Sequence, residues 1–403
     1  MISVKSAPTW LSVAYVLTSA LFYLPILMLF YGYKGVGMGN FFLIQGIANL
    51  AVFFMEVPTG YIGDLFSRKH TLIIGVLLWI LGHAVWIFGS GFSMILLGEL
   101  ILALSIAFIS GTAEAYLYDL LKKHNQESLF HKKYAQMKMF EGIVLMIATL
   151  TGAFIYQFLG PAIPVCVTIL CSMVSIIILC YLPDVPEARR IVSEDKSKWQ
   201  DITDISKYAV KHSEIKWLML LPAMYGTLTL VLMWGLQSVM VFRQVPVYVF
   251  SLVLGINALM QTFWSGVSGR ILEKINLSGT IILQNLIIVI ATLGACVSAY
   301  VPLWCVYICL GLMIVGAASY SLSNITTSVL VNHRIQSNER ATILSVKSML
   351  ARAFQGIGLI CLKPLFDDIG VGPTFMVSAL LLIPILICAI HLYKMKLKTI
   401  NDK

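Results

Sequence analysis

Long apolar stretches follow one another along almost the whole 403-residue chain, separated by short polar segments. A bilayer core about 30 Å thick requires roughly 20 consecutive, mostly apolar residues for one helical crossing. The pattern therefore predicts an all-α membrane protein with twelve transmembrane helices. The predicted spans are residues 10–32, 39–63, 71–90, 93–117, 139–159, 162–182, 217–240, 247–268, 279–299, 303–330, 341–363 and 372–393.

One long polar segment divides these spans into two groups of six. Residues 183–216 contain Pro183, Pro186 and many charged side chains, so they are too polar to cross a membrane. We therefore predict an N-terminal six-helix half at 1–182, a cytoplasmic linker at 183–216 and a C-terminal six-helix half at 217–403.

The two halves also resemble each other in sequence. A shift of 209 positions aligns residues 46–50 (GIANL) with residues 255–259 (GINAL), and a shift of 213 aligns Ser110 with Ser323. Internal repeats of this kind are typical of secondary transporter folds. The sequence therefore predicts two six-helix pseudo-repeats.

Composition and charge agree with a membrane protein. Only 12% of the residues are charged and 59% are hydrophobic, whereas soluble domains have about a quarter charged residues. The net charge is +9, but 23 of the 28 Lys and Arg residues fall in segments that are cytoplasmic when both termini lie inside. Because positive residues concentrate on the cytoplasmic side of membrane proteins, the basic balance is topological and predicts no nucleic-acid partner.

The sequence contains no set of residues typical of an enzyme. All eight cysteines lie in apolar spans without metal-ligand spacing, and no nucleophile, metal site or carboxylate pair gathers at a polar surface. We therefore expect no enzymatic activity, no cofactor and no metal site.

A ten-residue motif stands between the second and third spans. Residues 60–69 read Gly-Tyr-Ile-Gly-Asp-Leu-Phe-Ser-Arg-Lys. This segment resembles the signature loop of the major facilitator superfamily, Gly-x-Leu-Ala-Asp-Arg-x-Gly-Arg-Lys. Gly60, Asp64, Arg68 and Lys69 fit the motif, whereas a leucine replaces the basic residue that usually follows the aspartate.

The resemblance implies a conformational latch at the cytoplasmic side. Asp64 would face the positive N-terminus of span eleven, and Arg68 would pair with Asp119 at the end of span four. Glu114 would belong to the same gate. The alternative is that Arg68 and Lys69 only anchor the loop on the cytoplasmic side. The predicted latch residues are Gly60, Asp64, Arg68, Lys69, Glu114 and Asp119.

Two further stretches, 110–119 and 339–345, resemble a bacterial branch of the family whose members are broadly described as exporters of drugs or metabolites. This resemblance implies a monomer in the bacterial inner membrane. Span four carries Glu99 where many proton-coupled members have arginine, and span five lacks the Gly-Pro-x-x-Gly-Gly motif of many antiporters.

Ionisable side chains inside the spans are the candidates for proton coupling. Placing one at a helix centre costs about 2.5 kcal/mol or more, so each is a site hypothesis. Glu99, Glu56 and Glu141 are the carboxylates that could exchange a proton. Glu99 is the first choice because it lies deep in a helix that lines the cavity in this fold. The alternative is that Glu99 is a fixed partner of Arg352 or Lys347.

Cations, aromatics and amides are the candidates for substrate binding. Arg352 lies near the predicted midplane and needs an anion, which could be Glu141, Glu99 or an acidic group of the substrate. Lys347 is shallower and is expected to extend toward the cytoplasmic surface. Apolar rings beside single amides suit an organic substrate. The further candidates are Tyr23, Tyr225, Trp234, Gln237, Tyr320 and Asn324.

Two functional hypotheses follow. The first is proton-coupled efflux, by antiport, of amphiphilic small molecules through alternating access of the two halves. The alternative is transport of an anionic metabolite, such as a carboxylate siderophore or an organic phosphate. The expected partners are the lipid bilayer, a small-molecule substrate and protons.

The charge bias predicts a topology that reporter fusions can test. Fusions should report the cytoplasm at four positions: Lys133, Lys198, Lys274 and Lys403. Fusions near Lys34 and Pro302 should report the outside. A cytoplasmic signal near Lys34 would overturn the assignment of the first two spans.

Overall fold

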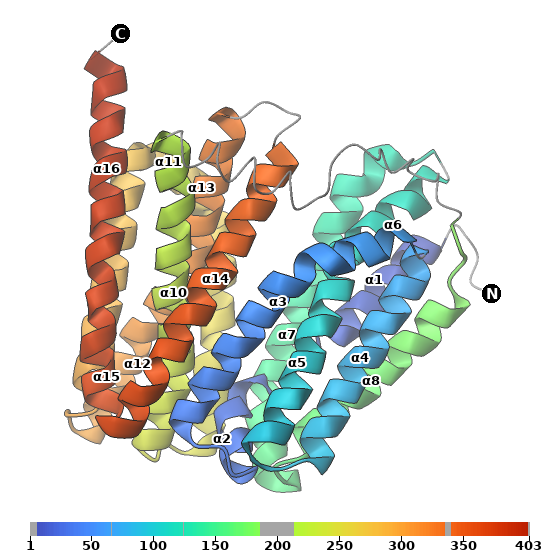
Figure 1. Ribbon diagram of the computed structural model, residues 1–403, viewed down its shortest axis with the longest axis horizontal. Helices are drawn as coiled ribbons and strands as arrows, with labels where there is room; N and C mark the ends of the chain where they lie inside the picture. The colour runs from blue at the N-terminus through green and yellow to red at the C-terminus, as the bar shows by residue number, and fades with distance from the viewer. Residues whose placement is uncertain (1–5, 66, 124, 186–212, 335–339, 402–403) are drawn as a thin grey trace. The chain divides into compact units, whose positions relative to one another are not determined.

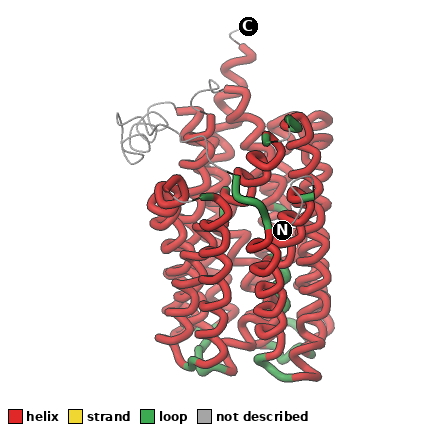
Figure 2. The backbone as a smooth tube through the Cα atoms, turned by 90° about the vertical axis from the view of Figure 1, so that its right-hand side faces the viewer, coloured by secondary structure: helices red, strands yellow, loops and turns green. Residues whose placement is uncertain are grey.

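The computed structural model describes residues 6–65, 67–123, 125–185, 213–334 and 340–401; the side chains described exclude those of 56–58, 60–65, 213–215, 277, 329–334, 340–345 and 394–401. Throughout these ranges the chain forms helices and loops and no strand (Figure 2). Most of the predicted linker lies outside the described residues.

The described residues up to 185 form these helical segments (Figure 1): α1 (Ala7–Thr18), η1 (Leu24–Ile26), α2 (Leu27–Tyr33), α3 (Met38–Leu65), α4 (Arg68–Phe88), α5 (Gly91–Ile109), α6 (Thr112–Lys122), η2 (Glu127–Leu129), α7 (Phe130–Leu159) and α8 (Ile163–Tyr181). The second part forms α10 (Ser213–Phe242), α11 (Val247–Ser298), α12 (Leu303–Ala318), α13 (Tyr320–Arg334), α14 (Arg340–Asp368), α15 (Val371–Ser378), η3 (Ala379–Leu381) and α16 (Leu382–Asn401). Among the described residues, eleven segments are long and apolar enough to cross a membrane.

The first predicted span is the one missing from that count. It was expected as one helix over residues 10–32, but it divides into α1, η1 and α2, with a break between Thr18 and Leu24. Pro25 lies in the first turn of η1. Because proline has no backbone N–H and its ring clashes with the preceding turn, it cannot continue the helix from α1.

Two other predicted spans are also broken, at corresponding places. Gly111, with a φ of +75°, separates α5 from α6, and Ser319 separates α12 from α13. Ser110 and Ser319 stand 209 residues apart, the first of the two shifts seen in the sequence. The break thus follows the shift of 209, whereas the starts of α5 and α12, Gly91 and Leu303, stand 212 residues apart, close to the shift of 213.

Two basic residues at helix ends, Lys34 and Arg243, are also 209 positions apart. Lys34 donates a hydrogen bond to the carbonyl oxygen of Ile87 at 2.5 Å, and Arg243 donates to the carbonyl oxygens of Ala299 and Val301 at 2.9 and 2.7 Å. In each half a basic side chain after the first crossing thus satisfies carbonyl groups at the end of the third, where a helix carries partial negative charge.

A polar cap also recurs, at the kink within α11. The sequence predicted a loop between spans eight and nine, but the two helical spans, Val247–Asn276 and Ser278–Ser298, follow each other across a kink at Asn276, whose φ is +53°. Its side-chain oxygen accepts hydrogen bonds from the N–H groups of Ser278 and Gly279 at 3.0 and 3.3 Å. Ser67, 209 residues earlier, caps α4 in the same way. Short polar caps therefore replace the expected loop.

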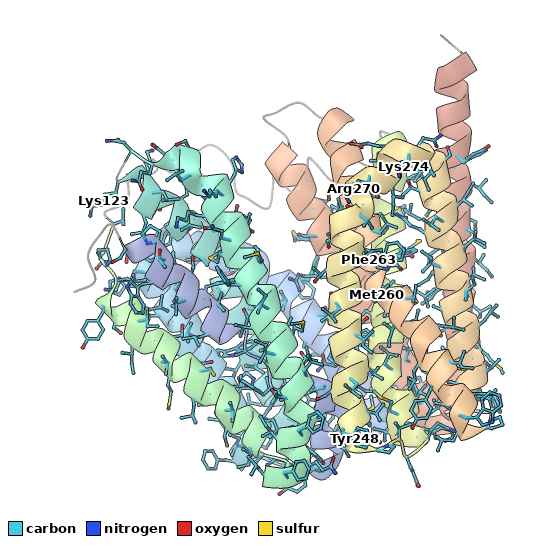
Figure 3. The ribbon with its side chains drawn as sticks, turned by 180° about the vertical axis from the view of Figure 1, so that it is seen from behind. Lys123, Tyr248, Met260, Phe263, Arg270 and Lys274 are labelled. Atoms are coloured by element: carbon cyan, nitrogen blue, oxygen red, sulfur yellow. The ribbon has the colours of Figure 1, made fainter. Side chains whose placement is uncertain are left out.

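The face of α11 that carries labels in Figure 3 changes character along the helix. Tyr248 lies near one end, Met260 and Phe263 lie in the middle, and Arg270 and Lys274 lie near Asn276. A band of apolar side chains closed by basic residues at one end is typical of a membrane-spanning helix.

The chain separates into two compact units. Unit 1 comprises Met1–Ser193 together with Val247–Gly255, and unit 2 comprises Glu194–Pro246 together with Ile256–Lys403. Within unit 1, buried apolar side chains of α1, α4, α6, α7 and α8 form one cluster. Within unit 2, Trp264, Ala318 and Leu322 join α11, α12 and α13. Each unit therefore has a core of its own.

Close helix packing in unit 1 depends on glycines of α4 and α5. A Cβ on Gly82 would lie 2.7 Å from Leu102 Cδ2, and a Cβ on Gly98 would overlap the indole of Trp86. Gly98 and Gly82 also face each other, since a Cβ on either would lie 3.0 Å from the other's carbonyl oxygen. Small residues allow helix backbones in membranes to approach closely.

Gly98→Ala should therefore destabilise the protein by about 1–3 kcal/mol, because the Trp86 indole has to move. Gly142→Ala is the matched control, since no atom lies within 4 Å of its added methyl group. Unfolding in mixed micelles, followed by circular dichroism, measures both. Equal stability of the two variants would show that the contact between α4 and α5 tolerates a larger residue.

Candidate functional site

An ion pair joins α4 to α6 at one end of unit 1. Arg68 Nε lies 2.8 Å from Asp119 Oδ2, and the two side chains are 25% and 28% exposed. Arg68 is the first residue of α4 and follows the capping residue Ser67. The pairing that the family motif suggested is present, whereas its role as a latch stays a prediction.

Lys69 has a more definite role than the sequence suggested. Its ammonium donates hydrogen bonds to the carbonyl oxygens of Cys180 and Leu182 at 2.9 and 2.8 Å. These groups belong to the C-terminal end of α8, where a cation is favourable. Lys69 therefore fastens the start of α4 to the end of α8.

The other proposed latch residues show no comparable contact with Arg68 among the described residues. Glu114 lies in the first turn of α6 and interacts with Tyr134 of α7, and no ion pair with Arg68 is found among the described residues. The surroundings of Gly60 and the side chains of Asp64 and of the coupling candidate Glu56 are not among those that the structure describes.

Glu99 is a buried carboxylate held by neutral groups. It lies on α5 and is 8% exposed. The phenol of Tyr31 donates a hydrogen bond to Glu99 Oε1, and the amide of Gln45 donates to the same oxygen at 2.6 Å. No cation pairs with Glu99 among the residues that the structure describes. Two neutral donors from α2 and α3 therefore hold this carboxylate between helices.

Aromatic rings enclose the groups around Glu99. The rings of Tyr23 and His83 lie 4.9 Å apart, and Tyr31 and Trp86 meet edge to face at 5.5 Å. His83 Nδ1 lies 2.8 Å from the carbonyl oxygen of Trp79. The substrate candidate Tyr23 is buried in this aromatic cluster. The site around Glu99 is therefore largely apolar.

Glu141 belongs to a second polar group, on α1 and α7. Lys138 Nζ lies 2.9 Å from Glu141 Oε2 and donates a hydrogen bond to the Tyr15 hydroxyl at 2.8 Å. The Tyr15 and Ser19 hydroxyls donate to Glu141 Oε1 at 3.2 and 3.4 Å. Lys138 was not among the candidates from the sequence, although its position three residues before Glu141 on a helix was the available signal.

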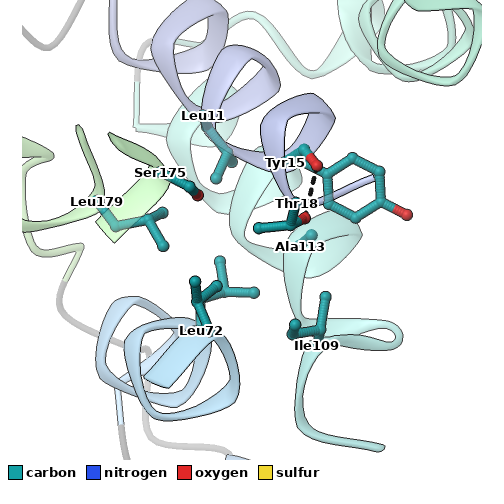
Figure 4. Close-up of a pocket in the computed structure, with 9 residues that line it drawn as sticks. Leu11, Tyr15, Thr18, Leu72, Ile109, Ala113, Ser175 and Leu179 are labelled. Atoms are coloured by element: carbon teal, nitrogen blue, oxygen red, sulfur yellow. Dashed lines mark hydrogen bonds between the residues drawn. The ribbon is translucent and has the colours of Figure 1, made fainter. Parts of the chain in front are cut away.

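A small pocket beside this polar group is lined mostly by apolar side chains, with the hydroxyl-bearing Tyr15, Thr18 and Ser175 among its lining residues (Figure 4). Leu11, Leu72 and Leu179 face its centre, whereas the phenol oxygen of Tyr15 points away from it. Such a lining offers a polar substrate few orienting partners. The pocket is therefore a packing gap and not the substrate site.

Lys347 is buried, in contrast to the expectation that it extends to the cytoplasmic surface. It is 5% exposed, and its ammonium donates to the carbonyl oxygen of Asn324, to Thr327 Oγ1 and to Ser328 Oγ at 3.1, 2.9 and 2.7 Å. All three partners are neutral and belong to α13. Polar groups on a neighbouring helix thus replace the expected contact with water.

Arg352 lies on the same helix, α14, and is only partly buried. It interacts electrostatically with the phenol of Tyr320 on α13. Tyr320 packs closely on α10, because a Cβ on Gly226 would lie 2.7 Å from its ring. Among the described residues, no carboxylate forms an ion pair with Arg352 or Lys347.

The remaining substrate candidates lie on α10 and are buried. The Tyr225 hydroxyl lies 2.7 Å from Ser319 Oγ and donates to the carbonyl oxygen of Gln284 at 3.1 Å. Trp234 and Gln237 are 6% and 0% exposed. Tyr225 therefore stabilises the broken helix at Ser319, and substrate contact by these three residues stays a prediction.

The described part of the chain contains eleven membrane-length helices in two units, with ionisable groups inside the spans. These features define an integral membrane protein of the secondary transporter class. The family model of the Major Facilitator Superfamily matches residues 9–359. The chain belongs to this superfamily.

Solved structures of transporters share the fold. The nucleoside transporter NupG matches with a TM-score of 0.78 and 16% identity, over 96% of this chain and 98% of that chain. A D-xylose-proton symporter matches with a TM-score of 0.73 and 12% identity, over 96% and 97%. At such identities the similarity establishes the fold alone.

A curated relative is similar over part of its length. The uncharacterized transporter BU466 of Buchnera aphidicola subsp. Acyrthosiphon pisum (strain APS) is 26% identical over 172 residues. The match covers 40% of this chain and 40% of that protein.

The Arg68–Asp119 pair should show a measurable coupling energy. In a double-mutant cycle of Arg68→Ala and Asp119→Ala, we expect about 1 kcal/mol, because both side chains are only partly exposed. The exposed pair Lys363–Asp367 on α14 is the control, with about 0.3–0.5 kcal/mol. Coupling no larger than in the control would reduce Arg68 to a loop anchor.

Proposed function

We propose that the protein is a proton-coupled secondary transporter that exports small amphiphilic organic molecules by alternating access. Glu99 is the proton-carrying group. The observation that supports this proposal is the environment of its carboxylate, which is buried and held by the neutral donors Tyr31 and Gln45.

A carboxylate without a cation beside it can exist in either protonation state. When ionised, Glu99 accepts hydrogen bonds from Tyr31 and Gln45; when protonated, it is a neutral group in a mostly aromatic site. Glu141 differs, because Lys138 neutralises its charge within the same unit. Glu99 is therefore the stronger coupling candidate of the two.

Structural relatives are compatible with this proposal. One of them, by its name, transports D-xylose together with protons. Efflux as the direction rests on the resemblance of residues 110–119 and 339–345 to exporters. The second candidate, transport of an anionic metabolite, is favoured by the cations of α14.

Glu99→Gln tests the proton-carrying role. Glutamine keeps an oxygen that accepts from Tyr31 and Gln45 but cannot bind or release a proton. In proteoliposomes, pH-driven accumulation of phenyl phosphate should fall at least about tenfold, while exchange of the same probe without a pH gradient continues.

The exposed Asp368 offers a matched control, since Asp368→Asn removes a carboxylate outside the aromatic cluster and should leave accumulation unchanged. Full pH-driven transport by Glu99→Gln would reject the role of Glu99 and favour Glu56 or Glu141. Loss of exchange as well as accumulation would indicate that Glu99 contacts substrate or supports the fold.

A further inference from the structure

Unit 2 carries an imbalance of charge within its membrane helices. Lys347 and Arg352, the α14 cations, lie inside the candidate span Val346–Asp368. The described carboxylates of unit 2 are all exposed: Glu273, Asp367 and Asp368. One of them, Asp367, already pairs with Lys363 at 2.8 Å. Within the described part of unit 2, no acidic side chain therefore neutralises the α14 cations.

The carboxylates that the sequence offered as partners for Arg352 have partners elsewhere. Glu99 accepts hydrogen bonds from Tyr31 and Gln45, and Glu141 pairs with Lys138. Both belong to unit 1, and both sets of partners come from unit 1 as well. Of the three anions considered from the sequence, an acidic group of the substrate is thus the one left.

The internal repeat allows a direct comparison of the membrane lysines in the two units. Lys138 and Lys347 stand 209 residues apart, so they occupy corresponding positions of α7 and α14. Lys138 has its carboxylate, Glu141, one helical turn further on, whereas the residue at the corresponding position of α14 is Leu350. The same lysine is therefore charge-neutralised in unit 1 and surrounded by neutral oxygens in unit 2.

The face of α13 that surrounds Lys347 also carries hydroxyl groups that can bind an anion. Tyr320, Asn324, Thr327 and Ser328 recur at helical spacing and so lie on one face of α13. The Thr327 hydroxyl already donates to the carbonyl oxygen of Ser323 at 2.8 Å, whereas the hydroxyl groups of Ser328 and Tyr320 can donate to an anionic oxygen. This face meets Lys347 through hydrogen bonds and Arg352 through Tyr320.

We propose that the α13 face and the α14 cations form an anion-binding subsite for a carboxylate or phosphate group of an organic substrate. The inference rests on the proposed function as a transporter and restricts its substrates to amphiphilic anions. Arg352, which is partly exposed, makes the first contact with the anion, and the buried Lys347 supplies a second charge about 7.5 Å further along the helix axis.

Binding to the purified full-length protein in phosphatidylcholine nanodiscs tests the subsite. Calorimetric titration compares phenyl phosphate and phenylacetate with two probes of similar size, the neutral 2-phenylethanol and the cationic 2-phenylethylammonium. Both anions should bind at least about tenfold more tightly than the other two probes. Equal affinity for all four probes would overturn the proposal.

Substitutions assign the selectivity to the α14 cations. Arg352→Gln and Lys347→Gln keep hydrogen-bond donors without the charge, and each should weaken phenyl phosphate binding about tenfold or more. Arg352→Lys should retain most of the affinity, and the control Lys363→Gln, on the same helix, should retain all of it. Unchanged binding in both Arg352→Gln and Lys347→Gln would overturn the proposal, and thermal unfolding of each variant excludes misfolding as the cause.

A lipid headgroup has the same chemistry as the proposed anion, so the bilayer composition is varied. If phenyl phosphate binding persists in nanodiscs containing phosphatidylglycerol, the subsite takes a soluble anion. If phosphatidylglycerol abolishes it, the assignment to a substrate is wrong. Binding is measured without a pH gradient, whereas coupling is measured as pH-driven accumulation, so a failure of proton coupling remains distinguishable from a failure of the anion subsite.

Discussion

An ionised side chain inside a bilayer needs a partner, and the placement of such partners organises this molecule. In unit 1, ionised side chains have partners within the same unit: Arg68 pairs with Asp119, and Lys138 with Glu141. Glu99 is stabilised by neutral donors instead, which leaves its charge state free to change. The helices that supply these partners are thereby fixed relative to one another within the unit.

The two halves share a backbone plan but differ in their charges. One helix break, one polar cap and one basic residue at a helix end recur after 209 positions, whereas the break between α1 and η1 has no counterpart in α10. The buried carboxylate does not recur, because the position that corresponds to Glu99 is Ile308. Unit 1 thus carries the group suited to a proton, and unit 2 carries the groups suited to an anion. A repeated scaffold has diverged into two chemically different halves.

The sequence predicted the membrane helices, the family and the Arg68–Asp119 pair, because hydropathy and a short motif carry that information directly. It did not predict the broken helices, since a break at Ser319 depends on tertiary partners such as Tyr225 and not on local composition. Lys347 was misjudged for a related reason. Its burial is set by Thr327 and Ser328 on another helix, and hydropathy along one segment contains no information about that contact.

The basic residues Lys34 and Arg243 directly follow α2 and α10. Their side chains donate hydrogen bonds to backbone carbonyl groups and not to carboxylates. A carboxylate partner would be protonated in an acidic medium and the attraction lost, whereas a carbonyl oxygen keeps its partial charge at any physiological pH. On the side that the charge bias assigns to the outside, the loops therefore stay fastened when the surroundings turn acidic. Ion pairs with a carboxylate, such as Lys363–Asp367 and Arg68–Asp119, are the contacts that acid can weaken.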